Sequence, residues 1–225
     1  MRVLRGRAAS IDADREATAE MLSAVATDGD AAVRVWTPHR QVAFGRRDAR
    51  ENGYEAAREA ASDRGFPPVE RSVGGRAVAY AGTTLAFALA EPIDDLREGL
   101  DDRYERATAA IERALREVGV GTERGEPDDS FCPGTHSLQC DGKVVGIAQR
   151  VRQDAALTAG VVVTDERDAV AAVLDDVYGA LGVPFDPDSV GSVAAAGGTG
   201  DPERVRTAIE REFVGDADAA VERVG

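Results

Sequence analysis

The sequence predicts an α+β fold in which a central, mostly antiparallel sheet is flanked by helices. Strand-like and helical segments are mixed along the chain, and the strand-like segments come in neighbouring pairs joined by short turns. Such pairs favour antiparallel strands over a doubly wound parallel sheet, whose strands alternate with helices. The 225 residues are enough for one large domain, or for one domain with a small appendage.

The N-terminal part of the chain carries several strand-like segments and two helical ones. Ser10 is a suitable cap for a helix over about 12–26, where apolar residues recur at helical spacing. An Ala-rich segment predicts a second helix over 53–64. Turns at Pro38 and Gly82 each join two neighbouring strands, the second pair as a hairpin. The strands are expected at 3–7, 32–36, 41–44, 69–72, 77–80 and 84–90.

The rest of the chain begins with a long helix over about 101–118, because apolar side chains form one stripe along it. An irregular loop rich in Gly, Asp, Glu and Pro follows over 119–134. The later elements are strands at 137–152, broken at Asp141-Gly142, and at 155–163, helices at 167–181 and 202–213, and a Gly/Ala-rich loop at 189–200. We divide the chain into a domain over 1–185 and a Gly/Ala-rich loop with a C-terminal helical appendage over 186–225.

The charge of the chain argues against one class of partner. The net charge is −14, and the acidic residues are spread along the whole sequence. Unspecific nucleic-acid binding needs a basic face, so no nucleic-acid partner is expected. The acid excess suits a hydrated surface in a salt-rich (halophilic) cytoplasm, where salt screens self-repulsion; an ordinary acidic cytosolic protein is the alternative. No apolar run approaches the ~18 residues of a membrane span, and the N-terminus is too polar for a signal peptide, so we expect a cytoplasmic protein without a membrane partner.

The cysteines and histidines do not form a metal-binding pattern. Cys132 and Cys140 lie eight residues apart, which is not a zinc spacing, and both are expected as free thiols in a reducing cytoplasm. His39 and His136 are far apart in the sequence. No bound metal is therefore expected.

Lys143 is the only lysine among 27 basic residues. Arginine therefore meets nearly every need for positive charge, and Lys143 is a candidate for work that arginine cannot do. A compact ammonium can point three donors at nearby oxygens and can lose its proton when desolvated, whereas a guanidinium is planar and stays charged. At the start of a predicted strand, Lys143 could hold a carbonyl oxygen and stabilise the charge that develops on it. A lysine retained by chance in an Arg-rich chain is the other interpretation.

Cys132 lies in the predicted loop between Phe131 and Pro133. A thiolate stabilised by a nearby cation can attack a thioester or an amide carbonyl. His136, four residues further on, is either the base for this thiol or an ordinary loop residue. The alternative is that Cys132 is a small buried apolar side chain, which is what we expect of Cys140 within a strand.

Gly74 and Gly75 follow a predicted strand. A glycine pair at such a place lets the backbone approach a ligand closely, and its amides can hold an anion or a carbonyl. The loop is not a phosphate-binding P-loop, because the pattern Gly-x4-Gly-Lys-[Ser/Thr] is absent. A plain tight turn is the other interpretation.

Four stretches of the sequence, in this order, resemble the catalytic domain shared by lipoate–protein ligases, octanoyltransferases and biotin–protein ligases. They are Val35-Trp36-Thr37-Pro38 through Val42-Ala43-Phe44-Gly45-Arg46, Arg71-Ser72-Val73-Gly74-Gly75-Arg76-Ala77-Val78, Thr83-Thr84-Leu85-Ala86-Phe87, and Gly142-Lys143-Val144-Val145-Gly146-Ile147-Ala148-Gln149-Arg150. The resemblance covers about residues 1–185 and implies the α+β fold of that catalytic domain. The single lysine of the chain falls on the family's essential lysine.

The segment around Cys132 resembles the cysteine loop of the amidotransferase-type members of this family. The resemblance implies an acyltransferase of protein lipoylation, which moves an octanoyl or lipoyl group to the lysine of a lipoyl domain through a cysteine thioester and needs no bound cofactor. It implies Cys132 and Lys143 as catalytic residues. The implied partners are lipoyl-domain proteins such as the glycine-cleavage H protein and the acyltransferase subunit of 2-oxoacid dehydrogenases. The implied substrate-binding residues are Arg71, Ser72, Gly74, Gly75, Arg76, Ala77, Gly146, Ile147 and Ala148.

Three alternatives remain at this point. An ATP-dependent lipoate–protein ligase would use ATP and Mg²⁺ to form lipoyl-adenylate, with a possible separate accessory subunit; against it, Ala159-Gly160 stands where ligases usually carry His-Gly. A biotin ligase is disfavoured because its Gly-Arg-Gly-Arg loop is absent. Val73 interrupts the usual Ser-Gly-Gly, and Arg76 fills a position that is often small. These two departures favour a non-catalytic module that binds lipoate or a lipoyl domain.

Overall fold

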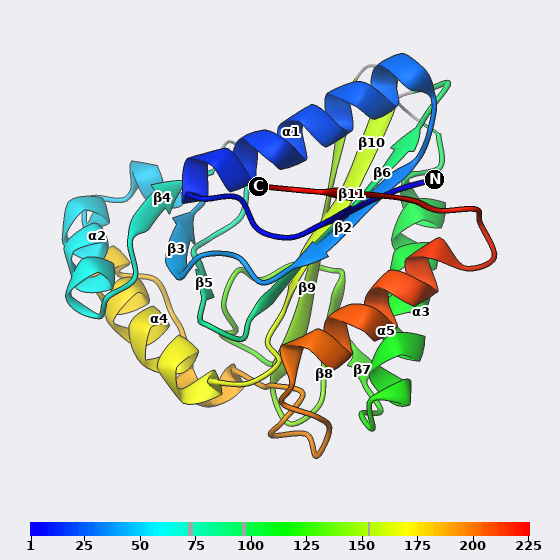
Figure 1. The fold of residues 1–225 in the computed structure, drawn as a ribbon. Helices are drawn as coiled ribbons and strands as arrows, with labels where there is room; N and C mark the ends of the chain where they lie inside the picture. The colour runs from blue at the N-terminus through cyan, green and yellow to red at the C-terminus, as the bar shows by residue number, and fades with distance from the viewer. Residues whose placement is uncertain (72–73, 96–97, 153) are drawn as a thin grey trace.

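An eight-stranded sheet crosses the centre of the molecule, counted over residues 1–71, 74–95, 98–152 and 154–225, which the computed structural model describes (Figure 1). Its strands are β1 (Arg2–Arg5), β2 (Ala32–Trp36), β6 (Leu85–Pro92), β7 (Glu123–Arg124), β8 (Ser137–Gln139), β9 (Lys143–Arg152), β10 (Ala155–Val162) and β11 (Ala220–Arg223). Their order is β11-β1-β2-β6-β10-β9-β8-β7. Among these described strands, β1–β2 and β1–β11 are the only parallel pairs, and the other five pairs are antiparallel. The predicted mostly antiparallel sheet is confirmed.

A smaller sheet lies beside the large one (Figure 1). In the described residues it consists of β3 (Gln41–Phe44), β4 (Pro68–Glu70) and β5 (Val78–Tyr80), in the order β4-β3-β5. β3 is parallel to β4 and antiparallel to β5. The chain therefore leaves the large sheet once, after β2, builds all three strands of the small sheet, and returns to the large sheet at β6.

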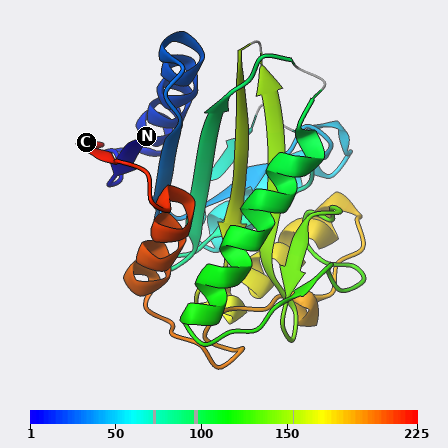
Figure 2. The same ribbon diagram turned by 90° about the vertical axis from the view of Figure 1, so that its right-hand side faces the viewer.

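Helices cover both faces of the large sheet and one side of the small one (Figures 1 and 2). They are α1 (Ile11–Asp28), α2 (Tyr54–Asp63), α3 (Leu100–Glu117), α4 (Arg167–Leu181) and α5 (Pro202–Val214), with short 3-10 turns at Asp48–Arg50 and Pro187–Ser189. Along β6, Ala88 packs in a cluster with Leu22 of α1, whereas Phe87 packs in a cluster with Ile111 of α3 and Ile209 of α5. Successive strand residues point to opposite faces, so this alternation gives the fold its three layers. α2 and α4 pack together over the small sheet.

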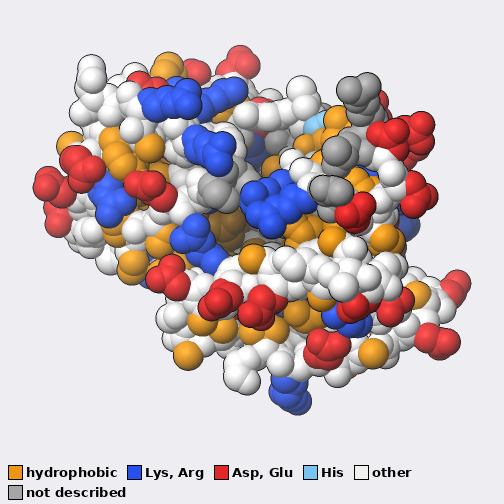
Figure 3. Space-filling view, turned by 90° about the horizontal axis from the view of Figure 1, so that it is seen from above, with side chains coloured by type: hydrophobic (Ala, Val, Ile, Leu, Met, Phe, Trp, Pro, Cys, Tyr) orange, Lys and Arg blue, Asp and Glu red, His pale blue; other side chains and the backbone are white. Residues whose placement is uncertain are grey.

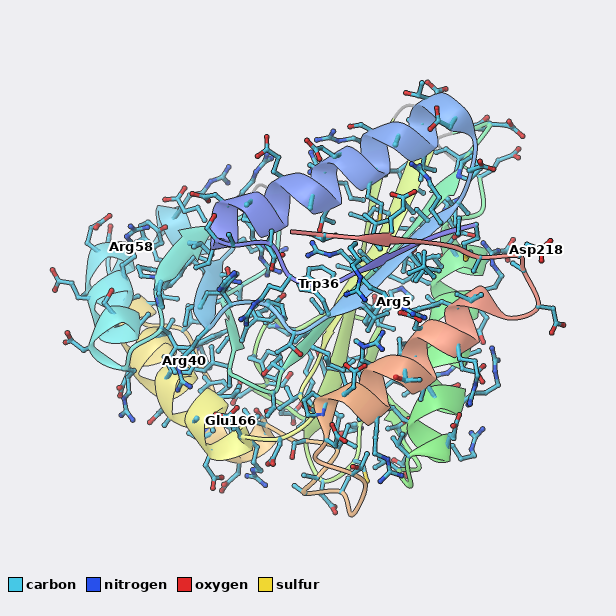
Figure 4. All side chains as sticks on the ribbon, in the orientation of Figure 1. Arg5, Trp36, Arg40, Arg58, Glu166 and Asp218 are labelled. Atoms are coloured by element: carbon cyan, nitrogen blue, oxygen red, sulfur yellow. The ribbon has the colours of Figure 1, made fainter. Side chains whose placement is uncertain are left out.

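A buried charge cluster fixes the start of α1 to β2. Ser10 caps the helix as predicted, because its Oγ accepts the N–H of Ala13 at 3.2 Å. Arg34 of β2 donates to Asp14 Oδ1 at 2.5 Å, and both side chains are buried. Trp36, labelled in Figure 4, adds an indole hydrogen bond to Asp14 Oδ2 at 3.1 Å. The tryptophan of the first resembling stretch thus anchors a helix.

The predicted pairing of neighbouring strands is wrong at two turns. β2 and β3 do not pair across Pro38, and β5 and β6 do not form a hairpin around Gly82. Instead, β2 pairs with β6 and β3 pairs with β5, both in antiparallel register. Each turn carries the chain from one sheet to the other. The segment β2–β3 therefore runs antiparallel to the segment β5–β6, with one half of this long pairing in each sheet. Alternation in a sequence defines the faces of a strand, whereas its partner depends on long-range packing.

The segment after residue 185 joins the same layers. Val205 and Ile209 of α5 pack in the core cluster that contains β2 and α3. β11, a strand that the sequence did not predict, pairs in parallel with β1 at the edge of the large sheet. The division of the chain at residue 185 stays a prediction. Within the described residues, no helix combines the length and apolar character needed to cross a bilayer.

Candidate active site

Cys132 lies in the loop between β7 and β8, which we call the cysteine loop and define as residues 127–136. The Cys132 side chain is partly exposed and carries a free thiol. Its backbone has φ +42°, a left-handed conformation that is uncommon for a residue with a side chain. Surrounding contacts must therefore hold it, and three different residues do so.

Arg71 contacts the sulfur. It follows β4, and its Nη2 donates to Cys132 Sγ at 3.2 Å and to the carbonyl oxygen of Arg76 at 2.5 Å. Burial by itself lowers the pKa of the Arg71 guanidinium, but the Cys132 sulfur and the Tyr80 hydroxyl raise it, and the net direction is upward. The buried Nε of Arg71 has no hydrogen-bond partner among the residues that the structure describes. A cation thus stands where a thiolate would need one.

Tyr178 of α4 contacts the backbone of two separate segments of the site. Its hydroxyl accepts the N–H of Cys132 at 2.7 Å and donates to the carbonyl oxygen of Ala77 at 3.1 Å. Burial raises the pKa of Tyr178, so the hydroxyl keeps the proton that it donates. One side chain thereby connects the cysteine loop to the glycine-pair segment.

The glycine pair lies directly against the thiol. Gly75 has φ +91°, and a Cβ there would lie 2.9 Å from both Cys132 Sγ and Arg71 Nη2. A Cβ at Gly45, the residue after β3, would clash with the carbonyl oxygen of Gly75. Around Gly74 the space is open. The close approach predicted for this segment exists, and Gly75 is the residue that permits it.

Arg76 of the same segment points to a different group. Its Nη1 lies 2.7 Å from Glu51 Oε1 and 3.4 Å from Asp48 Oδ1. Burial raises the pKa of Asp48, while the Gly45 N–H and Arg76 oppose that shift. The guanidinium of Arg76 is thus engaged with two carboxylates, which accounts for a charged residue at a position that is often small.

Lys143 reaches the cysteine loop from the first position of β9. Its side chain is 1% exposed. The ammonium donates to Glu126 Oε2 at 2.6 Å and to the carbonyl oxygens of Phe131 and Cys132 at 2.9 and 3.0 Å. An ammonium has three N–H groups, so all of them are used. The structure brings Lys143 and Cys132 together, but the lysine contacts the loop backbone and not the sulfur.

Glu126 is a site residue that the sequence analysis missed. Its Oε1 accepts the N–H of Gly134 at 2.7 Å, and its Oε2 accepts the hydroxyl of Ser137 at 2.8 Å as well as the Lys143 ammonium. A buried lysine requires a counter-charge, and that requirement is the signal that could have found this residue. The neighbouring Glu123 and Asp128 carry the same signal in sequence. Geometry was needed to select Glu126.

His136 lies on the other side of its loop. Its ring stacks on Tyr104 of α3, with the centroids 3.6 Å apart and the planes 9° from parallel. Among the described residues, no hydrogen bond joins the His136 ring to Cys132. The loop-residue interpretation of His136 therefore agrees with its position.

Of the remaining residues predicted from the resemblance, one lies beside Lys143, one is in the core and one is at the surface. A Cβ at Gly146 would lie 3.4 Å from Lys143 Cε, so this glycine leaves room beside the lysine. Ile147 packs in the core cluster with α3 and α5, and Ala148 is exposed. Ser72 lies outside the described residues, as does Val73.

Positive charge gathers at the surface near a depression. In Figure 3 the face seen from above has a hollow near its centre, with hydrophobic side chains within it and Lys or Arg side chains at its edge. Burial, Arg152 and Arg46 together lower the pKa of Arg150, so these three guanidinium groups are close enough to interact. A group of neighbouring cationic side chains is a local exception in a chain whose net charge is −14.

Known proteins are similar to this chain over most of its length. Residues 13–214 match a family model described as the lipoyl protein ligase A/B catalytic domain. The octanoyl-[GcvH]:protein N-octanoyltransferase of Exiguobacterium sibiricum is 34% identical over 164 residues, which cover 71% of this chain and 59% of that protein. The protein of the same name from Exiguobacterium sp. AT1b is 32% identical over 164 residues, which cover 72% of this chain and 58% of that protein. The chain thus spans less than two thirds of the length of these curated relatives.

Solved structures share the fold at lower identity. Lipoate-protein ligase A bound with ATP superimposes with a TM-score of 0.75 at 21% identity, over 100% of this chain and 89% of that chain. The bi-partite lipoate protein ligase of Thermoplasma acidophilum, analysed with its E2 lipoyl domain, gives a TM-score of 0.70 at 19% identity, over 100% and 87% of the two chains. At these identities the likeness establishes the architecture.

Proposed function

Since this chain belongs to the lipoyl protein ligase A/B catalytic domain family, we propose that it is an acyltransferase of protein lipoylation that works through a thioester on Cys132. It moves an octanoyl or lipoyl group to the lysine of a lipoyl domain. One observation carries the proposal. The Cys132 sulfur accepts a hydrogen bond from Arg71, and the Lys143 ammonium donates to the backbone carbonyl of the same cysteine. A ligase that activates its acid with ATP has no use for such a thiol.

The chemistry takes place in two balanced steps. The sulfur of Cys132 attacks the carbonyl carbon of an acyl-lysine amide on the donor carrier. The C–N bond breaks, the thiol proton leaves with the departing amine, and an acyl-thioester forms. The lysine amine of the acceptor then attacks the thioester, the C–S bond breaks, and the sulfur takes back a proton. Arg71 stabilises the negative charge on sulfur, and the Lys143 ammonium donates to the carbonyl oxygen as charge develops there.

The names of the relatives support the class of partner. Octanoyl-[GcvH] is the donor in the name of the curated relatives, and a ligase with the same fold was analysed with an E2 lipoyl domain. We infer lipoyl-domain proteins of these two kinds as donor and acceptor for this chain. The reaction needs no bound cofactor, and its substrates are an octanoyl or lipoyl group on a carrier. The spread of acidic residues supports a salt-rich cytoplasm as the place of action.

The proposal is tested by intact mass. The purified protein is incubated in high salt with an octanoylated carrier and without ATP. We expect a gain of one octanoyl group, which is lost on hydroxylamine treatment and absent from Cys132→Ala. If no acyl group is gained without ATP, but lipoyl transfer to an acceptor domain occurs once ATP, Mg²⁺ and lipoate are added, the protein is a ligase, with or without an accessory subunit. Binding of an octanoylated carrier without any covalent product under either condition would indicate a non-catalytic module.

A further inference from the structure

The ammonium of Lys143 is buried together with one carboxylate. Glu126 Oε2 lies 2.6 Å from Lys143 Nζ, and the two side chains are 17% and 1% exposed. Burying an ammonium without a counter-charge costs on the order of several kcal/mol of stability. Phe131 and Cys132 offer only neutral carbonyl oxygens to the same ammonium. Glu126 is therefore the group that makes this placement of Lys143 possible.

The same carboxylate closes the cysteine loop. Glu126 precedes the loop, and its two oxygens bind the N–H of Gly134 and the hydroxyl of Ser137 on the far side of Cys132. A single side chain thus connects the two ends of a segment that would otherwise be joined only through the backbone. Closing a loop in this way removes conformations from the residues within it.

The bonds converge on the backbone of the nucleophile. The carbonyl group of Cys132 is held by Lys143, and Lys143 is held by Glu126. The φ of +42° at Cys132 is a conformation that a cysteine adopts only when its surroundings impose it. Loss of the Glu126 carboxylate would therefore free the ammonium and weaken its hold on the Cys132 carbonyl, while the Cys132 N–H would still be bonded to Tyr178.

From this geometry we propose that Glu126 is the positioning residue of the transfer: it holds the Lys143 ammonium and both ends of the cysteine loop in one fixed relation to the Cys132 thiol. The inference rests on the proposed thioester function and deepens it. All three N–H groups of Lys143 are occupied, so an acyl carbonyl gains one only by replacing the carbonyl oxygen of Phe131 or Cys132. Glu126 keeps the ammonium in place during that exchange. A displacement of about 1 Å in such an arrangement lowers rates by about 100-fold.

The experiment compares Glu126→Gln with the wild-type protein in single-turnover acylation by an octanoylated carrier, followed by intact mass. Glutamine keeps the shape and removes the charge. We expect the rate constant of acyl-enzyme formation to fall by about 100-fold while the final amplitude stays complete and the carrier concentration at half-maximal rate changes by less than about twofold. Glu126→Asp keeps the charge on a shorter side chain and should recover part of the rate. Glu212→Gln is the matched control, because Glu212 is paired with Arg113 at the same 2.6 Å, between α5 and α3.

Other outcomes overturn the inference in distinguishable ways. A wild-type rate constant in Glu126→Gln, at any amplitude, would mean that Glu126 only supports folding. A fall of the same size in Glu212→Gln would mean that the loss is a general effect of removing an ion pair. If the wild-type protein gains no acyl group, the proposed function fails and the role in transfer fails with it. Hydrogen exchange of the Cys132 and Gly134 amides, which needs no substrate, then still reports whether the carboxylate orders the loop; unchanged exchange in Glu126→Gln would refute that as well.

Discussion

Arg71 Nη2 lies 3.2 Å from Cys132 Sγ and joins two residues that are 61 positions apart in the chain. The structure gives three basic side chains of the predicted site different contacts. Arg71 contacts the sulfur, Lys143 contacts the carbonyl oxygen of Cys132, and His136 stacks on Tyr104. The sulfur and the carbonyl oxygen of Cys132 are thus contacted by two separate side chains.

Replacement of Arg71 by lysine should slow acylation of Cys132. A charge-assisted hydrogen bond contributes about 1.5–3 kcal/mol, so the rate should fall roughly 10- to 100-fold. Arg71 makes both contacts, to the sulfur and to the Arg76 carbonyl, through Nη2 of a planar guanidinium, and an ammonium keeps the charge without that geometry. The rate of thioester formation by mass spectrometry is the measurement. Arg58→Lys on α2, where the guanidinium contacts Tyr54, should leave the rate unchanged; an equally fast Arg71→Lys enzyme would separate this arginine from the chemistry.

Gly75→Ala should destabilise the protein, whereas Gly74→Ala should not. Gly75 has φ +91° and has no room for a Cβ beside Cys132 Sγ, while nothing lies within 4 Å of a Cβ at Gly74. The left-handed conformation alone costs roughly 1–2 kcal/mol for an alanine. Urea unfolding in the same high-salt buffer measures both free energies. Equal stability of the two variants would contradict the close contact.

Tyr178→Phe should lower the free energy of unfolding by about 1–3 kcal/mol, because the Cys132 N–H and the Ala77 carbonyl lose their hydroxyl partner in a buried place. Tyr54→Phe is the matched change nearer the surface, where the hydroxyl contacts Glu70. It should cost less. Chemical denaturation of both variants is the test, and a larger loss in Tyr54→Phe would show that the bridge contributes little.

Arg34→Met should cost about 3–5 kcal/mol of stability, because it leaves Asp14 buried without its counter-charge. Arg40→Met removes an exposed pair, in which Arg40 Nη1 lies 3.7 Å from Glu166 Oε1 (Figure 4). That change should fall within about 1 kcal/mol. Urea midpoints at several salt concentrations measure both. A small effect of Arg34→Met would indicate that water or a rearranged helix reaches Asp14.

Lys143→Arg should reduce acyl transfer by about 100-fold although the charge is kept, because a guanidinium does not fit the three acceptors that surround the ammonium. The converse change on the surface, Arg113→Lys on α3, should leave transfer intact. Steady-state transfer to an acceptor lipoyl domain is the measurement. Full activity of Lys143→Arg would show that position 143 requires only a positive charge.

The sequence predicted the elements well and their partners less well. The range Arg167–Leu181 of α4 and the cap of α1 were predictable, because helical spacing and capping are local signals. The exchange of partners between β2, β3, β5 and β6 was not, since pairing depends on contacts between distant segments. β11 was missed because four exposed residues next to the C-terminus carry no apolar alternation.

In the candidate site too, residues with a local sequence signal were predictable, whereas residues selected by long-range contacts were not. The single lysine and the cysteine in a Pro/Gly loop are visible in sequence, and the structure brings them together. Tyr178 lies on the apolar stripe of α4, where a core tyrosine and a tyrosine that bridges two site segments have the same pattern. Glu126 is one of several acidic residues near the loop, and only its distance to Lys143 distinguishes it.

Under the proposed thioester function, the burial of the only lysine in these 225 residues affects where the acyl group can go. A reactive thioester is passed to whichever primary amine reaches it, and a catalyst covered with lysines would gradually modify itself. Here the sole side-chain amine of the chain is 1% exposed and donates all of its N–H groups inside the protein. The many arginines keep the surface cationic where needed without offering a competing nucleophile. Under the proposed function, these 225 residues thus offer no exposed lysine that would compete with the acceptor lysine of a lipoyl domain.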